Sequence, residues 1–182
     1  MENIKQGCVL LVEDEEAVRE SLKELLELFD FQVYAVRCVD HAIKILEEQQ
    51  DIEAIVSDLK MPGKMGIDTL RYLNSKERNI PVIFLTGWGT METCQEALKE
   101  GAFDYILKPI ENKDKVLFPL KQAIERYRLE KNNEELELDV LRMAEQHEKL
   151  LDSILSDVEI KNKVQEKIAT IIQKWEKKKK RN

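Results

Sequence analysis

Five side chains with the chemistry of a phosphoryl-transfer site each come directly after a short apolar run: Glu13 and Asp14, Asp58, Thr86, and Lys108. The runs occupy residues 9–12, 54–57, 82–85 and 105–107. Short apolar runs bounded by turn residues are typical of buried strands. Ligands of an open parallel sheet bind beyond the carboxyl ends of its strands. We therefore expect these five side chains to meet at one edge of a sheet.

The first 120 residues alternate strand-like runs with amphipathic helical segments. Strands are expected at 8–12, 32–36, 54–57, 81–85 and 104–107. Helices are expected at 16–29, from Asp40, at 67–73, from Thr90 to 98, and from a point between 111 and 116. Asp40 and Thr90 are expected as helix caps, and Gly101 as a helix stop. This order predicts an α/β fold with a doubly wound, five-stranded parallel sheet, flavodoxin-like, in strand order 2-1-3-4-5.

Composition indicates one domain followed by an extension. The chain is 43% apolar and 36% charged, and its apolar runs are too short to span a membrane. We expect a cytoplasmic protein, because no apolar leader opens the chain and three cysteines lack metal-ligand spacing. All six glycines and all four prolines lie in residues 1–119. Long helices avoid both residue types, so the boundary falls near Pro119.

The last 63 residues are expected to be helical. One unbroken helix of that length would extend about 95 Å and would need to bury its apolar stripe. The stripe widens toward the C-terminus, which favours a helical bundle or hairpin over a strict two-stranded coil. Asn132 with Glu135 and Ser156 with Glu159 match the capping-box pattern, so each pair could begin a new helix. A single continuous helix is the alternative at both places.

The clustered acids would need a cation. A carboxylate can attack phosphorus and form an acyl phosphate, and Asp58 is the proposed nucleophile. Three carboxylates within a few ångströms repel one another, and Mg²⁺ would relieve that repulsion through the oxygen ligands it prefers. We expect Asp14 and Asp58 to bind Mg²⁺ directly, and Glu13 to bind it directly or through water. The backbone carbonyl of Lys60 could fill another position.

The two remaining polar groups would serve the phosphoryl oxygens. Lys108 supplies a fixed positive charge, and the Thr86 hydroxyl can donate a hydrogen bond. Each feature has an ordinary explanation when taken alone. Residues 13–16 could be an acidic first helical turn favoured by the helix dipole, and Lys108 could be a surface lysine before a turn. Their joint placement at strand ends is what favours a site.

Four segments of the sequence resemble the receiver domain of two-component response regulators. They are LLVEDEE at 10–16, SDLKMPG at 57–63, VIFLTGWGT at 82–90 and GAFDYILKPI at 101–110. The resemblance covers about residues 5–125 and follows the order of the family's motifs. It implies a receiver domain at 1–125, followed at 126–182 by a helical extension that forms a coiled coil or a helical bundle.

The resemblance also implies the phosphoryl donor and the cofactor. A phosphorylated histidine kinase or phosphotransfer protein would donate to Asp58. Mg²⁺ would be held by Glu13, Asp14, Asp58 and the backbone carbonyl of Lys60. Glu13 stands where many family members have Asp. Such a protein is a phosphoacceptor rather than an enzyme, since it catalyses only its own phosphotransfer and slow autodephosphorylation.

The same resemblance assigns switching and tuning residues. Lys108 would contact the phosphoryl group, and Thr86 with Tyr105 would form a switch pair that alters the face made by the fourth helix, fifth strand and fifth helix. Lys60 and Trp88 occupy positions that influence how water reaches the acyl phosphate. We expect the bulky Trp88 to slow autodephosphorylation; the alternative is simple surface packing.

No familiar effector motif follows the receiver-like part. The leading hypothesis is a phosphorylation-controlled switch whose C-terminal helix forms a homodimer or docks a partner. Its alternatives are a connector whose DNA-binding or catalytic output is absent from this chain, and a structural coiled-coil protein with a silent receiver. We interpret His147 as an exposed helix residue rather than a phosphotransfer histidine. We interpret the basic segment 177–181 as a solvated helix end rather than a nucleic-acid-binding site. We expect no membrane partner.

Overall fold

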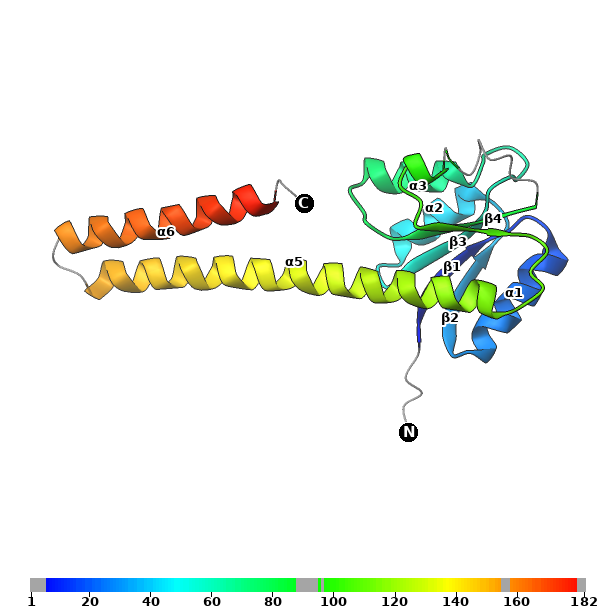
Figure 1. The fold of residues 1–182 in the computed structure, drawn as a ribbon, viewed down its shortest axis with the longest axis horizontal. Coiled ribbons are helices and arrows are strands. Elements are labelled where there is room, and N and C mark those ends of the chain that lie inside the picture. The colour runs from blue at the N-terminus through cyan, green and yellow to red at the C-terminus, as the bar shows by residue number, and fades with distance from the viewer. Residues whose placement is uncertain (1–5, 88–94, 96, 155–157, 180–182) are drawn as a thin grey trace. The chain divides into compact units, whose positions relative to one another are not determined.

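The computed structural model describes residues 6–87, 95, 97–154 and 158–179 of the chain (Figure 1). Most of the helix expected from Thr90 to 98, together with Trp88, lies outside these residues. The chain divides into two compact units, Met1–Glu130 and Lys131–Asn182. The first unit contains the sheet, and the second is helical.

The first unit is a five-stranded parallel sheet in the order β2-β1-β3-β4-β5, which confirms the predicted fold class. The strands are β1 (Gly7–Val12), β2 (Phe31–Val36), β3 (Ala54–Asp58), β4 (Val82–Thr86) and β5 (Asp104–Leu107). The helices are α1 (Glu16–Leu28), α2 (Val39–Glu48), α3 (Ile67–Ser75) and α5 (Asp114–Ile154), the last of which continues into the second unit.

Two apolar cores cover the two faces of the sheet. Alternate β1 residues point to opposite faces, so that Leu10 and Val12 enter the core with α2 and α3, while Val9 and Leu11 enter the core with α1 and α5. Both faces are therefore hydrophobic, as expected for a parallel sheet between helices (Figure 1). Burying each large side chain stabilises the fold by about 1.5–3 kcal/mol. Sliding a strand along the sheet would expose such side chains, so this energy fixes where the strands end.

Strand register brings the predicted site residues to one level of the sheet. Val12 of β1 pairs with Ser57 of β3, so the residues that come next, Glu13 and Asp58, lie side by side at the end of the two strands. Asp58 in turn pairs with Leu85, and Thr86 pairs with Leu107. Residues almost a hundred positions apart in sequence therefore reach the same carboxyl edge.

The sequence assigns Gly101 and Asp40 to helix ends. Gly101 is confirmed as a helix stop, because it has a φ of +100° and its N–H donates to the carbonyl of Leu98. The prediction that Asp40 caps a helix is wrong. The N-cap is Cys38, so that Asp40 is already the second residue of the helix, past the position from which a side chain caps it. Its carboxylate instead pairs with Lys64 at 2.6 Å.

An ion pair ties α5 to the edge of the sheet opposite the site. Arg128 Nε lies 2.6 Å from Glu53 Oε1, and its second guanidinium nitrogen lies 2.8 Å from Oε2 and 3.2 Å from the carbonyl of Gln6. Glu53 also accepts the backbone N–H of Cys8 at 3.1 Å. Such a two-pronged pair fixes the direction of a helix better than a single contact does.

The second unit is a helical hairpin. α5 runs without interruption through Asn132, so a new helix does not begin there. A second helix, α6 (Val158–Lys179), follows, and Ser156 of the second capping pattern lies outside the described residues. α6 returns beside the end of α5, where Gln165 donates to Glu148 at 3.5 Å (Figure 1). Within the described parts of the chain, no helix is both long and apolar enough to cross a membrane.

Replacing Gly66 with alanine should destabilise the first unit. A Cβ at this position would lie 2.1 Å from the carbonyl oxygen of Asp58 and 2.8 Å from the Ser57 hydroxyl, so β3 or α3 must move. Overpacking of this kind costs about 1–3 kcal/mol. Urea unfolding should show that loss for G66A and a much smaller one for the control G87A, whose added Cβ meets nothing nearer than 4.0 Å. Equal stabilities of G66A and wild type would contradict the packing.

Candidate phosphoryl-transfer site

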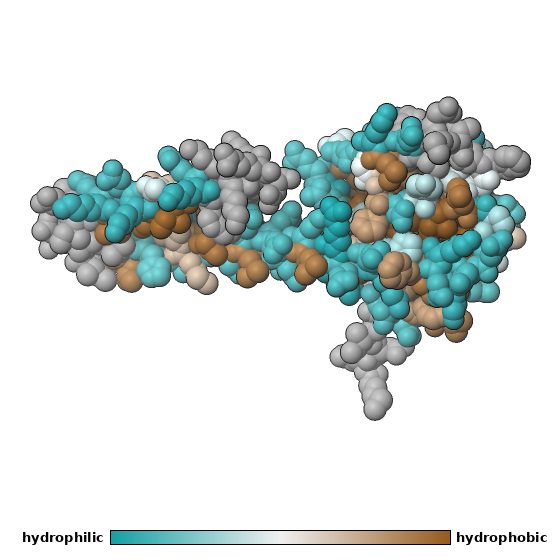
Figure 2. Space-filling view, in the orientation of Figure 1, coloured by the Kyte–Doolittle hydropathy of each residue, from teal (hydrophilic) through white to brown (hydrophobic). Residues whose placement is uncertain are grey.

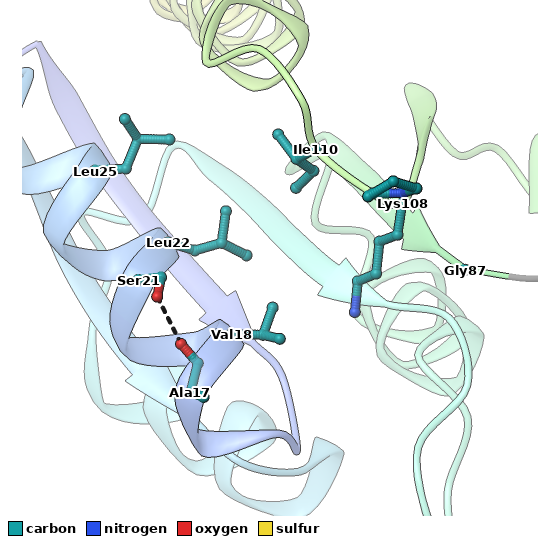
Figure 3. A pocket seen from close by; sticks show the side chains of 9 residues that line it. Ala17, Val18, Ser21, Leu22, Leu25, Gly87, Lys108 and Ile110 are labelled. Atoms are coloured by element: carbon teal, nitrogen blue, oxygen red, sulfur yellow. Dashed lines mark hydrogen bonds between the residues drawn. The ribbon is translucent and has the colours of Figure 1, made fainter.

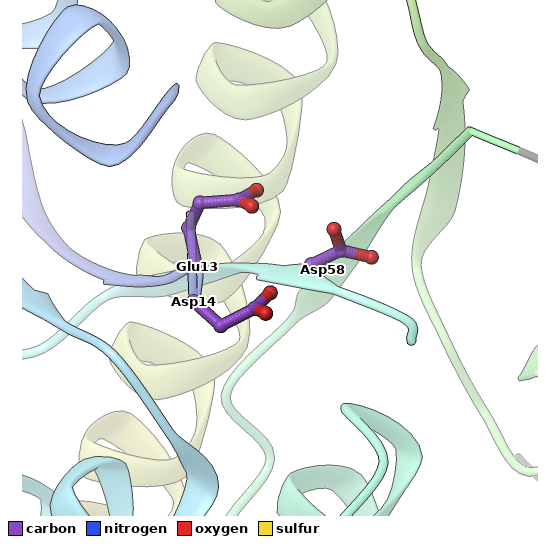
Figure 4. Close-up of side chains that lie close together, drawn as sticks. All are labelled: Glu13, Asp14 and Asp58. Carbon is purple, nitrogen blue, oxygen red and sulfur yellow. The ribbon is translucent and has the colours of Figure 1, made fainter. Parts of the chain in front are cut away.

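Three carboxylates converge beyond the carboxyl ends of β1 and β3. Glu13, Asp14 and Asp58 each offer an oxygen within 4.8 Å of the other two, and Figure 4 shows the side chains of Glu13 and Asp14 reaching toward Asp58. Glu13 is 1% exposed and Asp58 is 9% exposed, whereas Asp14 faces solvent. Water therefore screens the repulsion between Glu13 and Asp58 only weakly.

Lys108 is the cation that the described structure places against these carboxylates. Its Nζ lies 2.7 Å from Glu13 Oε2 and 2.5 Å from Asp58 Oδ2. The end of β5 positions it, because the Lys108 N–H continues the strand pairing by donating to the carbonyl of Thr86 at 2.8 Å. The peptide bond that follows, Lys108–Pro109, is cis.

Burial and pairing set the protonation of the two partners. Burial raises the pKa of Glu13, and the hydrogen bond from Lys108 only partly opposes that effect. Burial alone would lower the pKa of Lys108, but its hydrogen bonds to Asp58 and Glu13 outweigh burial and raise it. Lys108 therefore stays protonated at neutral pH, while burial disfavours the charged form of Glu13.

The donor set suits Mg²⁺. One Glu13 oxygen, Oε1, is buried without a hydrogen-bond partner, while the other is paired with Lys108. An orphaned carboxylate oxygen beside two further carboxylates is the arrangement that a hard, oxygen-seeking cation satisfies. The residues predicted from the sequence as carboxylate ligands are thus brought together. The part of the Lys60 carbonyl stays a prediction.

Lys60 has a contact that the sequence analysis did not foresee. Its backbone N–H donates to Asp58 Oδ1 at 3.0 Å, which leaves Oδ2 as the oxygen turned toward Lys108. A second unforeseen group is Arg19, whose guanidinium contacts the carbonyls of Glu13 and Asp14 at 3.0 and 3.4 Å. Arg19 therefore braces the acidic turn from α1. Its sequence signal is only a basic residue one turn and a half after the acids.

The predicted switch residues lie on neighbouring strands. Thr86 ends β4 and is 2% exposed, whereas Tyr105 on β5 is 38% exposed. Their pairing as a switch stays a prediction, and Trp88 lies outside the described residues. His147 is an exposed residue of α5 in the second unit.

A groove of about 690 Å³ opens beside Lys108 (Figure 3). The turn after β5 forms one wall, with Lys108, Pro109 and Ile110, and α1 forms the other. The α1 residues are Ala17, Val18, Ser21, Leu22 and Leu25. Val18 and Leu25 belong to the apolar stripe of this helix, yet both are only half-buried. A mostly apolar surface thus leads directly to the lysine of the site.

Comparison with known proteins gives one consistent family. The profile of the response regulator receiver domain matches residues 9–125. The chain is 34% identical over 144 residues to a putative NtrX-like response regulator of Rickettsia felis, covering 78% of this chain and 30% of that protein. It is 40% identical over 120 residues to the transcriptional regulatory protein FixJ of Rhizobium meliloti, covering 65% of this chain and 55% of FixJ.

A solved structure extends the similarity to the fold. A response regulator receiver domain protein from Clostridium thermocellum superposes with a TM-score of 0.64 at 31% identity, covering 68% of this chain and 98% of that one. The chain spans 30% of the length of the NtrX-like relatives, so what those longer proteins do as a whole does not transfer to it.

Magnesium affinity should respond in opposite directions to two substitutions. Glu13→Gln removes a buried ligand charge and should weaken Mg²⁺ binding by about tenfold or more. Lys108→Ala removes the cation that occupies two of the same carboxylates, and should strengthen binding by about threefold to tenfold. Isothermal titration calorimetry on folded variants measures both. A Glu13→Gln variant with wild-type affinity would show that Mg²⁺ binds elsewhere.

Proposed function

The chain belongs to the response regulator receiver domains of two-component systems, and we propose on that basis that Asp58 is its phosphoacceptor. The donor is the phosphohistidine of a histidine kinase or of a phosphotransfer protein. The observation that supports this most strongly is the contact of one lysine with Glu13 and Asp58 at the carboxyl edge of the sheet. We place the receiver domain at residues 1–125 and its helical extension at 126–182.

The proposed reaction is an in-line displacement at phosphorus. Asp58 Oδ2 attacks, because Oδ1 is held by the Lys60 N–H. The new O–P bond forms as the P–N bond to the donor imidazole breaks, and the electron pair of that bond returns to the imidazole nitrogen, which takes a proton from solvent. The product is an acyl phosphate on Asp58 and a neutral donor histidine.

Three groups of the chain serve this displacement. Lys108 leaves Asp58 Oδ2 as the phosphoryl group arrives and pairs with one of its oxygens, so its positive charge stays close to the reacting atoms. The Thr86 hydroxyl donates to another oxygen. The buried position of Glu13 and Asp58 keeps water away from these charges, which strengthens each contact.

Mg²⁺ would be held by Glu13, Asp14, Asp58 and the Lys60 carbonyl. When bound, it supplies positive charge that lowers the repulsion between the carboxylates and the incoming phosphate. Glu13 Oε1, buried without a hydrogen-bond partner, supports its part in holding the ion. Asp14, exposed at the rim, would complete the carboxylate set from the solvent side.

Phosphorylation is proposed to change the surface that carries the signal. Thr86 moves toward the phosphoryl group and vacates space that Tyr105, now partly exposed, enters from the outer side of β5. The face that includes β5 and the start of α5 then differs between the two states. In the receiver family, the positions of Lys60 and Trp88 influence how easily water reaches the acyl phosphate, and we propose that Trp88 slows hydrolysis.

The proposed output is association through the helical extension, either with a second copy or with a partner protein. The helix α5 supports this, because it runs from Asp114 to Ile154 and so belongs in part to the receiver fold and in part to the hairpin. Nucleic-acid binding and membrane binding form no part of the proposal. We place the protein in the cytoplasm, where its donor would be phosphorylated.

Labelling with acetyl phosphate and Mg²⁺ tests the phosphoacceptor directly. Wild type should gain one phosphoryl group, Asp58→Asn should gain none, and Lys108→Ala should be labelled at least about tenfold more slowly because the transition state loses a full charge. Intact-mass spectrometry follows the reaction. Label that persists in the Asp58→Asn variant would overturn the assignment.

Light scattering with the phosphoryl mimic beryllofluoride and Mg²⁺ tests the output. We expect a change in the mass or shape of the wild-type chain, since a switch needs only a few kcal/mol of differential stability. Thr86→Ala should bind the mimic yet show a reduced change. An unaltered wild-type profile at saturating mimic would favour the connector or structural hypotheses over the switch.

A further inference from the structure

The part of α5 that lies in the second unit carries an exposed row of residues at coiled-coil spacing. We call it the outer stripe: Asn133, Leu136, Val140, Met143, His147 and Leu150. The steps are three, four, three, four and three residues, which places all six on one side of the helix. The four leucine, valine and methionine side chains at 136, 140, 143 and 150 are between 47% and 62% exposed.

A shallow groove coincides with this stripe. Met143, His147 and Leu150 line it together with Gln146, and its volume is about 280 Å³. Figure 2 shows hydrophobic side chains reaching the surface at intervals along this helix. The outer stripe is therefore an apolar surface with a depression into which another side chain can fit.

The outer stripe is distinct from the side of α5 that contacts α6. Glu137, Ala144 and Glu148 are half-buried, and Glu148 accepts the hydrogen bond from α6. At about 100° per residue, the outer stripe lies roughly a quarter-turn from this row. Among the side chains that the structure describes, the apolar residues of the outer stripe thus remain exposed beside the hairpin contact.

α6 has a matching exposed edge. Val164, Ile168 and Ile172 are half-buried and form the row that faces α5, while Ile171 beside them is 61% exposed. Seen along each helix from its N-terminus, Ile171 is rotated away from the α6 row that faces α5 in the same direction as the outer stripe is rotated away from the α5 row that contacts α6. Because the two helices run in opposite directions, both displacements point to the same side of the hairpin. On that side of the hairpin, α5 contributes the outer stripe and α6 contributes Ile171, with lysines around it.

The hairpin alone buries little. Within residues 131–150 and 162–174, whose side chains the structure describes, none is fully buried. Two helices without a buried layer do not make a stable unit in water, because helix stability in proteins comes from packing an apolar face. A further layer of helices would supply that packing.

Charge indicates which layer fits. Residues 131–154 of α5 hold seven acidic and three basic residues, whereas residues 158–179 of α6 hold three acidic and seven basic residues. The hairpin is thus acidic along one helix and basic along the other. A second copy of the hairpin presents the same two charges and complements the first, whereas a partner of uniform charge would repel one of its helices.

The same charges select the symmetry of the pair. A two-fold axis across the helices would stack acidic α5 on acidic α5, and basic α6 on basic α6. A two-fold axis parallel to the helices stacks each acidic α5 on the partner's basic α6. Only the second arrangement lets each helix neighbour the opposite charge on both sides.

We propose that two copies of this chain join through their hairpins into a four-helix bundle, in which the outer stripe of α5 packs against the partner's α6. The two α5 helices are then parallel and lie diagonally across the bundle. Asn133 and His147 are the polar residues of the stripe, and they set the register at a cost in stability. This inference rests on the part of the proposed function that assigns output to the extension, and it does not depend on phosphorylation.

A matched pair of leucines tests the surface. Leu136 belongs to the outer stripe and is 62% exposed, while Leu138 lies on the opposite side of the same helix and is 55% exposed. Leu136→Lys should weaken dimerisation by about a hundredfold, since it buries a charge beside basic α6, whereas Leu138→Lys should leave it within about threefold. Sedimentation equilibrium of the full chain without phosphodonor measures both, and circular dichroism checks helix content.

The outcomes of these experiments distinguish a failure of the proposed bundle from a failure of the assignment of Asp58 as phosphoacceptor. A monomer at all concentrations, or an equal loss for both lysine variants, would overturn the bundle. The Asp58→Asn variant should dimerise like wild type, and Leu136→Lys should still be labelled by acetyl phosphate. Failure of the bundle therefore leaves Asp58 untouched, and failure of labelling leaves the bundle untouched.

Spin labels test the symmetry. Single labels at Glu134, Leu138 and Glu145, which share the side of α5 away from the outer stripe, are introduced one at a time after the three native cysteines are replaced by alanine. Parallel, diagonal α5 helices about 14 Å apart predict three similar inter-label distances. Distances that change steadily along the helix would show an antiparallel pairing and overturn the arrangement.

Discussion

The repulsion between buried carboxylates at one edge of the sheet is the constraint on which the site depends. Glu13 and Asp58 are almost entirely buried, and Lys108 contacts both. A buried carboxylate without a cation is costly, so the fold needs positive charge at this edge. The raised pKa of Glu13 shows that one lysine compensates only in part. A divalent ion can supply the positive charge that is still missing, both for the carboxylates and for an incoming anionic phosphoryl group.

The fold supplies this geometry through strand register rather than through loops. The strand ends bring Glu13, Asp58 and Lys108 to one level, and the apolar cores on both faces prevent the strands from sliding. Arg128 holds α5 at the opposite edge of the sheet, where it donates hydrogen bonds to the Glu53 carboxylate and the Gln6 carbonyl. The helix that covers the sheet is thus held to the receiver fold near Arg128, and the residues of α5 that follow in the second unit carry the outer stripe.

The strand ends and the site residues beyond them could be predicted from the sequence, because an apolar run followed by polar residues marks the end of a buried strand. Asp58 and Lys108 were placed by that pattern alone. The capping role of Asp40 was predicted wrongly, since the sequence pattern does not resolve a shift of two residues at a helix start. The contacts of the Lys60 N–H and of Arg19 depend on backbone geometry, which the sequence pattern does not report. The outer stripe of α5 can be told from the side that contacts α6 only by the exposed fractions of its side chains.

A crystal structure of the chain with Mg²⁺ and beryllofluoride would show whether the ion, the phosphoryl mimic and the buried carboxylates share one site. We expect a metal ion bound by Glu13, Asp14 and Asp58, a beryllium atom on an Asp58 carboxylate oxygen, and Lys108 Nζ moved from that carboxylate to a fluorine. A shared site would be contradicted by a metal ion bound away from Glu13, or by Lys108 still joined to both carboxylates while the mimic is bound elsewhere.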